Sequence, residues 1–292
     1  MKPIETVGII FNSRAPRAVS MATDVQEIVN KTHDCWHETA DGVGTRSELV
    51  NTDLLITVGG DGTILRAAQA AAPHKVSILG INLGRLGFMT ELSAEEALVK
   101  IPSFLNGHGW LEERSMIQVD VQHSGGTNGK QESTGYHALN DVVLGRGAVA
   151  RVIRVQVSID GAYLTSYRSD AILICTATGS TGYNLSAGGP ILEPQASEMV
   201  LKPVAPHVGI ATALVLPRSA SVELQIESED PAIFSVDGFL DLRLKKGDTV
   251  KVKQSSLTSL FLRERTPQDF YASLTRRLGF ESNDGIGRSV SY

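Results

Sequence analysis

The chain has 292 residues, 42% of them hydrophobic, so it can bury a sizeable core and is expected to divide into two domains. Its net charge is −5 and its isoelectric point is about 5.8, which argues against nucleic acid or an anionic membrane as a partner. Cys35 and Cys175 form no paired motif, and no apolar run is long enough to span a bilayer. We therefore expect a cytoplasmic protein without disulfides or a membrane partner.

The first hundred residues alternate between buried-strand runs and segments with helical spacing. The predicted strands are Val7–Phe11, Leu54–Val58 and Val76–Ile81, and the predicted helices are Ala18–Val29, 45–50, Ile64–Ala72 and Ser93–Leu105. This alternation predicts a Rossmann-like α/β domain with a parallel sheet over residues 1–105.

Beyond residue 105, short alternating or β-branched runs are separated by Gly, Asp and Ser. The runs are Met116–Val121, His137–Leu144, Val152–Ile159, Ala171–Thr176, Val222–Ile226, Ile233–Val236, Val250–Val252 and Leu257–Leu262. They predict a larger, mostly β domain over residues 106–265. Helical spacing returns at Pro267–Leu278, so residues 266–292 are expected to form a C-terminal helix, packed back on the first domain, and a tail.

The stretch Gly59-Gly60-Asp61-Gly62 joins a predicted buried strand to a predicted helix. Such a turn gathers free backbone N–H groups and the positive end of a helix dipole, which suits it to hold phosphate. Asp61 could accept a proton from an attacking hydroxyl or help to hold a phosphate-bound metal. The alternative is a tight turn in which the Asp caps the helix.

The segment HDCWHE at residues 33–38 must be considered as a metal site because His33, Cys35, His37 and Glu38 are close in sequence. The chain offers no spacing that completes a ligand set with them. We therefore predict an ordinary strand or loop here and no dedicated metal site.

Polar residues interrupt the β region in places where its neighbours are apolar. They are Asn140-Asp141, Arg168-Ser169-Asp170 and the stretch TATGSTGYNLSAGGP at residues 176–190. Buried amides and carboxylates need partners, and a nucleotide has many hydrogen-bonding edges that would supply them. The alternative is that the Asn-Asp pair anchors a loop and that the Gly/Ser/Thr stretch is a turn with a helix cap.

Together these motifs resemble the NAD kinases. GGDG at 59–62, the Asn-acid pair, the Arg-Ser-Asp triplet, the 176–190 stretch and PVAPH at 203–207 occur in that family's order, and the likeness extends from Val7 to about Phe280. GGDG alone is shared with lipid kinases and phosphofructokinases, whereas the 176–190 stretch is far more specific. The resemblance implies phosphoryl transfer from ATP, or polyphosphate in some members, to the 2′-hydroxyl of the adenosine ribose of NAD, giving NADP. Magnesium or another divalent metal would arrive with ATP.

The resemblance also implies roles for individual residues. Asp61 would be the general base, and Gly60, Gly62 and Arg66 would contact phosphates. Asn140 would bind the adenine edge or ribose, Asp141 a ribose diol, and Tyr183 would stack on a base. The other expected binding residues are Phe88, Arg151, Arg168, Asp170, Thr178, Thr181, Gly182, Asn184, Leu185 and Ser186.

The sequence departs from the family's commonest pattern at Asp141, where Glu is usual, Ala171 (Gly), Ala177 (Pro) and Gly182 (Ala). These departures bear on substrate affinity and on the choice between NAD and NADH. Family members are commonly homodimers or homotetramers, and contacts between subunits can complete the site. The alternatives are a lipid kinase of the same superfamily, although no basic amphipathic helix or lipid anchor is evident, and a non-catalytic NADP(H)-binding sensor.

Overall fold

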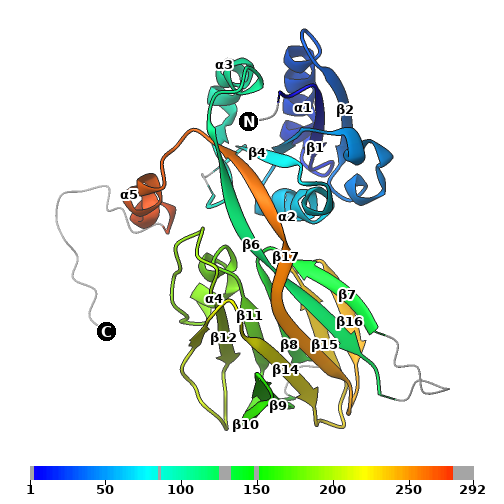
Figure 1. Cartoon of the computed structure of the whole chain (residues 1–292), viewed down its shortest axis with the longest axis vertical. Coiled ribbons are helices and arrows are strands. Elements are labelled where there is room, and N and C mark those ends of the chain that lie inside the picture. The colour runs from blue at the N-terminus through cyan, green and yellow to red at the C-terminus, as the bar shows by residue number, and fades with distance from the viewer. Residues whose placement is uncertain (1–2, 85–86, 125–132, 148–150, 279–292) are drawn as a thin grey trace.

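The computed structural model of the chain describes residues 3–84, 87–124, 133–147 and 151–278 (Figure 1). Most of the polar stretch at 123–133 and the tail at 279–292 lie outside the described residues. The helices are α1 (Pro16–Val29), α2 (Asp61–Ala71), α3 (Ala94–Leu105), α4 (Tyr183–Ser186) and α5 (Gln268–Arg277). Short 3₁₀ turns occupy Val43–Thr45, Ser47–Asn51, Ala72–His74 and Gly179–Thr181.

The N-terminal part is an α/β layer, as the sequence predicts. Its strands β1 (Thr6–Phe11), β2 (Asp34–Thr39), β3 (Leu54–Val58) and β4 (Ser77–Asn82) are all parallel, in the order β4-β3-β1-β2. The two-residue strand β5 (Leu92–Ser93) pairs with β4. Helices α1 and α3 contribute to the apolar cluster on one side of this sheet, and α2 contributes to the cluster on the other.

Strand β3 shows why this sheet carries helices on both faces. All of its residues are buried, and Leu54, Ile56 and Val58 belong to the cluster with α1 and α3 while Leu55 belongs to the cluster with α2. Side chains alternate between the faces of a strand, so a continuous apolar run fits a sheet that is covered twice. The carboxyl ends of β1, β3 and β4 therefore share one edge, where ligands of such sheets bind.

The remaining strands form the β-rich part. They are β6 (Trp110–Gln122), β7 (Ser133–Ala138), β8 (Asp141–Arg146), β9 (Ile153–Ile159), β10 (Ala162–Ser169), β11 (Ala171–Cys175), β12 (Met199–Val204), β13 (Leu214–Leu216), β14 (Ser221–Ile226), β15 (Ala232–Val236), β16 (Leu240–Leu244) and β17 (Thr249–Arg263). Within the described residues, β13-β12-β11-β8-β15-β16 form a six-stranded antiparallel sheet. This sheet packs on β6, β7, β9, β14 and β17 through a shared apolar cluster.

Strand β17 joins the two parts of the molecule. It pairs antiparallel with β6 along its length and parallel with β4 at Leu260 and Phe261, so an eleven-stranded sheet runs through the described chain (Figure 1). The domain limits at residues 105 and 265 stay a prediction, because hydrogen bonding continues across them. Helix α5 returns to the N-terminal part as predicted, with the Phe270 ring 6.2 Å from that of Phe88.

Some strands differ from the sequence prediction. The predicted runs Val250–Val252 and Leu257–Leu262 are one strand, β17, whose pairing with β6 shifts between Gln254 and Thr258. A register shift breaks the alternation of buried and exposed side chains, so the sequence pattern of one long strand looks like that of two short strands. The predicted run His137–Leu144 is two strands, β7 and β8, which lie in different sheets and separate at Leu139-Asn140.

Candidate active site

The glycine-rich turn lies between β3 and α2 at the carboxyl edge of the parallel sheet. Gly60 occupies the N-cap position of α2, and Asp61 is the first helical residue. A Cβ atom at Gly60 or Gly62 would meet nothing within 4 Å, so both backbones face open space. The turn therefore presents the amino end of a helix to solvent, as a phosphate site requires. The alternative in which Asp61 is the N-cap does not fit, because Gly60 holds that position.

The carboxylate of Asp61 lies against the backbone of Gly87. A Cβ atom at Gly87 would stand 2.6 Å from Oδ1 of Asp61, closer than such atoms approach in proteins. The Gly87 amide donates to Oγ1 of Thr90 at 3.1 Å, which closes this short loop after β4. On this side the Asp61 carboxylate therefore faces the backbone of Gly87, which carries no side chain.

A cavity of about 230 Å³ opens at the same turn. Arg14 and Arg66 line it, and the carboxylate of Asp41 lies between them, 3.7 Å from Nη2 of Arg14 and 3.4 Å from Nε of Arg66. Two guanidinium groups beside the amino end of a helix provide positive charge for a chain of phosphates.

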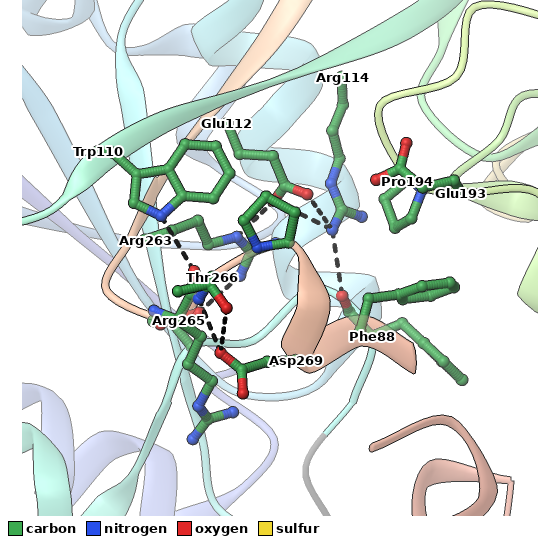
Figure 2. A pocket seen from close by; sticks show the side chains of 13 residues that line it. Phe88, Trp110, Glu112, Arg114, Glu193, Pro194, Arg263, Arg265, Thr266 and Asp269 are labelled. Atoms are coloured by element: carbon green, nitrogen blue, oxygen red, sulfur yellow. Dashed lines mark hydrogen bonds and ion pairs between the residues drawn. The ribbon is translucent and has the colours of Figure 1, made fainter. Parts of the chain in front are cut away.

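The segment that follows Gly87 is held by a buried ion cluster (Figure 2). Arg114 donates from Nη2 to the carbonyl oxygen of Phe88 at 3.3 Å, and Arg263 donates from Nη1 to that of Met89 at 2.9 Å. Glu112 accepts from both guanidinium groups, at 2.5 Å from Arg263 and 3.2 Å from Arg114. Burial alone would raise the pKa of Glu112, but the two arginines hold it below its ordinary value.

The space between these side chains measures about 40 Å³, which is room for water and not for a nucleotide. Phe88 lines it together with Glu193 and Pro194, from the segment after α4 (Figure 2). The Phe88 ring, predicted to bind a ligand, thus packs toward α5 and this small cavity. The same cavity brings the loop that touches Asp61 next to the segment that follows Tyr183–Ser186.

Asn140 and Asp141 lie where the chain leaves one sheet for the other. The carboxylate of Asp237, in the turn between β15 and β16, organises this crossing. Its Oδ2 accepts the backbone N–H of Leu139 at 2.9 Å, and its Oδ1 accepts those of Asn140 at 2.8 Å and Asp141 at 3.1 Å. The Asn-Asp turn is therefore held from outside its own strand.

The Asn-Asp turn is also attached to α2. Gln69 donates from Nε2 to the carbonyl oxygen of His137 at 2.9 Å and reaches Oδ2 of Asp237 at 3.5 Å. The guanidinium carbon of Arg66 stands 4.4 Å above the ring of Phe239, in the same β15–β16 turn. The helix that starts at the glycine turn and the loop that carries Asn140 consequently form one packed unit.

Asp141 is 9% exposed. Burial, with a smaller contribution from the charge of Asp237, raises the pKa of Asp141 to about 7. Burial raises the pKa of Asp237 in the same direction. The pair therefore carries less negative charge at neutral pH than two ordinary carboxylates would.

The 176–186 stretch packs on the carbonyl side of the Asn-Asp turn. Thr176 donates its backbone N–H to the carbonyl oxygen of Asn140 at 2.9 Å, and a Cβ atom at Gly179 would stand 2.1 Å from that oxygen. Oδ1 of Asn140 and Oγ1 of Thr178 are buried, and among the described residues they have no hydrogen-bond partner. Buried oxygens without a donor, one on each of these two packed segments, suit a ligand that brings donors.

The other predicted binding residues in this stretch differ in burial and in whether their side chains already form hydrogen bonds within the protein. Asn184 is buried and holds the loop itself, since its Nδ2 donates to the carbonyl oxygens of Ser180 at 3.1 Å and Pro190 at 2.8 Å. Thr181 donates to the carbonyl oxygen of Thr178 at 3.2 Å. Tyr183 is 44% exposed, so its ring is available for stacking. Gly182 and Leu185 are half-buried and Ser186 is exposed.

Arg168 lies in β10, Asp170 follows that strand directly, and Arg151 comes two residues before β9. Both strands lie at the end of the β-rich part that is far from the α/β part (Figure 1). The antiparallel pair β8–β11 places Asp141 opposite Cys175, five residues beyond Asp170. At about 3.3 Å per residue, roughly 16 Å of strand separates Asp170 from Asp141.

Two of these distant residues form ion pairs within the β-rich part. Asp170 pairs with Arg146 at 3.1 Å, and Arg151 pairs with Asp230 at 3.4 Å. A single chain, within the residues the structure describes, does not bring them to the glycine turn.

The chain is similar in sequence to known NAD kinases along most of its length. The models of the ATP-NAD kinase N-terminal domain and the ATP-NAD kinase C-terminal domain match residues 31–109 and 139–263. The NAD kinase of Dehalococcoides mccartyi (strain CBDB1) is 39% identical over 93% of this chain and 95% of its own. That of Chloroflexus aurantiacus (strain ATCC 29366 / DSM 635 / J-10-fl) is 35% identical over 94% of this chain and 99% of its own. The chain belongs to the NAD kinase family.

Two solved structures of NAD and NADH kinases share the fold. Yeast NADH kinase, complexed with NADH, superposes with a TM-score of 0.84 at 22% identity, covering 99% of this chain and 91% of that one. An NAD kinase from Archaeoglobus fulgidus in complex with ATP superposes with a TM-score of 0.71 at 24% identity, covering 92% and 98%. Both likenesses concern the fold.

The structure adds residues to the site that the likeness to NAD kinases did not suggest. Arg14 lies in the turn after β1, Gly87 touches Asp61, and Asp237 and Phe239 reach across from the β15–β16 turn. The Asp-Gly pair at 237–238 between two alternating runs is a hairpin signal that could have located that turn. Its contacts with the Asn-Asp turn follow from tertiary packing, which one sequence does not show.

Neither a metal cage nor a membrane helix is found among the described residues of this family member. No three His, Cys, Asp or Glu side chains in that part of the chain converge on one point. Burial raises the pKa of Cys35 to about 11, so its thiol is neutral at neutral pH. In the same part of the chain, no helix combines the length and the apolar character needed to cross a bilayer.

Proposed function

We propose that this protein transfers the γ-phosphoryl group of ATP to the 2′-hydroxyl of the adenosine ribose of NAD, giving NADP and ADP. The observation that carries the proposal is the position of Asp61, a carboxylate on the first residue of α2 beside a glycine-lined cavity, in a chain that belongs to the NAD kinase family. A carboxylate repels phosphate, so its place beside a phosphate site calls for a chemical role.

In this proposal Asp61 is the general base. It accepts the proton of the 2′-hydroxyl while the hydroxyl oxygen forms a bond to the γ-phosphorus and the bond to the bridging oxygen of ADP breaks. Gly87 supports this role, because its missing side chain leaves the space that the Asp61 carboxylate occupies. Positioning and charge neutralisation supply most of the catalysis of phosphoryl transfer.

The ATP phosphates would lie in the cavity at Gly60 and Gly62. Arg66, and Arg14 across the cavity, supply the positive charge. A divalent metal travelling with ATP would neutralise further phosphate charge. Asp41, which lines the cavity, and Asp61, the first residue of α2, carry oxygens of the hard type that magnesium prefers.

The NAD adenosine would lie across the Asn-Asp turn and the 176–186 stretch. The unpaired oxygens of Asn140 and Thr178 accept hydrogen bonds from an amine or a hydroxyl, and Asp141 binds a ribose diol. Tyr183 stacks on a base. Asp141 is one methylene shorter than the usual Glu, so it demands a closer approach of the ribose.

Arg151, Arg168 and Asp170 take part only if a second copy of the chain brings its far end to this site. A homodimer or homotetramer, common in the family, would supply that copy. The proposal thus includes an oligomer whose subunits complete one another's nucleotide sites.

A coupled assay tests the proposed function. ATP with Mg²⁺ and NAD is supplied, and NADP is followed through an NADP-specific dehydrogenase, with NADH and polyphosphate tried in parallel. NADP formation supports the proposal. Transfer to diacylglycerol or sphingosine alone would make the protein a lipid kinase, and tight NADP binding without turnover would make it a sensor.

A further inference from the structure

The turn between β15 and β16 has the backbone that an Asp-Gly pair favours. Asp237 has φ +49° and Gly238 has φ +71°, the paired left-handed conformation of a tight hairpin turn. Positive φ is uncommon for a residue other than glycine. Asparagine or glycine at position 237 would also fit this turn, so the backbone alone does not explain why an Asp stands there.

The side chain of Asp237 accounts for that choice. It is 7% exposed, and its carboxylate oxygens accept the backbone N–H groups of Leu139, Asn140 and Asp141 at 2.8 to 3.1 Å. The backbone N–H of Asp237 in turn donates to the carbonyl oxygen of Asp141 at 2.9 Å. The two turns are thus bound to each other in both directions.

The same carboxylate faces the helix that carries Asp61. Oδ2 of Asp237 lies 3.5 Å from Nε2 of Gln69, which also donates to the carbonyl oxygen of His137 at 2.9 Å. Gln69 lies eight residues after Asp61 in α2, or about 12 Å along the helix axis. Asp237 therefore touches both the loop proposed to hold the ribose and the helix proposed to carry the base.

We propose that Asp237 is a positioning residue of the phosphoryl-transfer site, which sets the Asn140-Asp141 turn against helix α2 so that the ribose hydroxyl meets Asp61. The inference rests on the proposed function. It assigns Asp237 no contact with substrate and no share in the proton transfer. Its effect comes through geometry, because a displacement of about 1 Å at a reacting centre can lower the rate about 100-fold.

The test compares Asp237→Asn with a matched control, Asp248→Asn. Asp248 is 1% exposed and likewise accepts backbone N–H groups, from Ser124 at 2.7 Å and Lys245 at 3.0 Å, but it lies in the turn between β16 and β17. In each variant an amide group replaces one acceptor oxygen and points its own N–H toward backbone donors. Both variants are expected to lose thermal stability.

The kinetic readout separates a positioning role from a structural one. For Asp237→Asn we expect kcat to fall about 100-fold while the Kd of ATP, measured by calorimetry, stays within about twofold of wild type. For Asp248→Asn we expect kcat and both KM values close to wild type. A kcat of Asp237→Asn within about threefold of wild type would overturn the inference.

A second variant keeps the test decisive if Asp237→Asn does not fold. Gln69→Leu, on a helix surface, removes the link to Asp237 and His137 and keeps the side-chain volume. We expect kcat to fall about tenfold with an unchanged Kd of ATP, and an unchanged kcat would overturn the link. Wild-type protein that forms no NADP would overturn the proposed function itself, whereas active wild type with unaffected variants would overturn this inference alone.

Discussion

At the scale of single residues, the contact between Asp61 and Gly87 leaves no room for a side chain at position 87. An added methyl group at position 87 would stand 2.6 Å from Oδ1 of Asp61 and displace the carboxylate. We expect Gly87→Ala to lower kcat about tenfold or more with little change in melting temperature. Gly44→Ala is the control, because its Cβ meets nothing within 4 Å. Equal kcat values in the two variants would show that the position of Asp61 does not limit the reaction.

Tyr183 has an exposed ring in the proposed NAD site, so we expect its replacement to change the binding of NAD and not the chemical step. Loss of stacking on a base typically weakens binding by about 1–3 kcal/mol. We therefore expect Tyr183→Ala to raise the KM for NAD about tenfold and to leave the KM for ATP unchanged. Tyr163→Ala, which removes a ring that is 63% exposed on β10, is the control. If both variants keep the wild-type KM for NAD, Tyr183 does not stack on the substrate.

The raised pKa of Asp141 makes the free energy of unfolding decrease as the pH rises. Its pKa is about 7 in the folded protein against 3.8 as the ordinary value, so ionisation costs more in the folded protein than in the unfolded chain. Its favourable contribution is present below about pH 4 and is lost as the pH rises through about 7. Unfolding free energies of wild type and Asp141→Asn, measured from about pH 5 to about pH 8, should show a smaller decline in the variant. Parallel curves would contradict the raised pKa.

At the scale of elements, segment 87–91 is held by side chains from β6 and the end of β17. Glu112 neutralises Arg114 and Arg263, which donate to the segment's carbonyl groups. We expect Glu112→Gln to lower the free energy of unfolding by about 3–5 kcal/mol, because the buried cluster of Arg114, Arg263, Glu112 and Glu91 loses one of its two negative charges. Urea unfolding measures the change.

A surface ion pair provides the comparison for that variant. Lys246 pairs with Glu229 where the two side chains are 56% and 83% exposed. Lys246→Ala should change the free energy of unfolding by less than about 1 kcal/mol. A Glu112→Gln loss as small as that of the surface variant would show that the cluster does not hold the segment.

At the scale of the whole molecule, local pattern predicted the α/β part best. Strand β3 and helices α1 and α3 have strong apolar periodicity, and the parallel sheet that they imply is confirmed. In the β-rich part, β10, β12, β13 and β16 escaped prediction. Most residues of β10 are polar or exposed, and β13 and β16 have only three and five residues. The sequence predicts one strand across the sheet change at Asn140 because apolar residues flank the Asn-Asp pair on both sides.

The parts of the site that lie in a sequence motif could be predicted. The parts that depend on contacts between distant segments could not. The glycine turn and Asp61 stand out in the sequence. In the structure Gly60 and Gly62 line a cavity at the carboxyl edge of the sheet, and the Asp61 carboxylate lies against Gly87. Asp237 lies about a hundred residues from Asn140, so their hydrogen bond appears only in the folded chain. The remoteness of Asp170 from Asp141 likewise follows from strand pairing, which a motif does not encode.

The central claim is that the two halves of the molecule deliver a ribose hydroxyl to Asp61, and the Asp61→Asn variant tests it most directly. NADP formation and the Kd of NAD are measured on the same preparations of wild type and variant. We predict that kcat falls at least about 1,000-fold, as loss of the base and of its orienting charge requires, while the Kd of NAD stays within about threefold. A variant that keeps near-normal kcat would contradict the account.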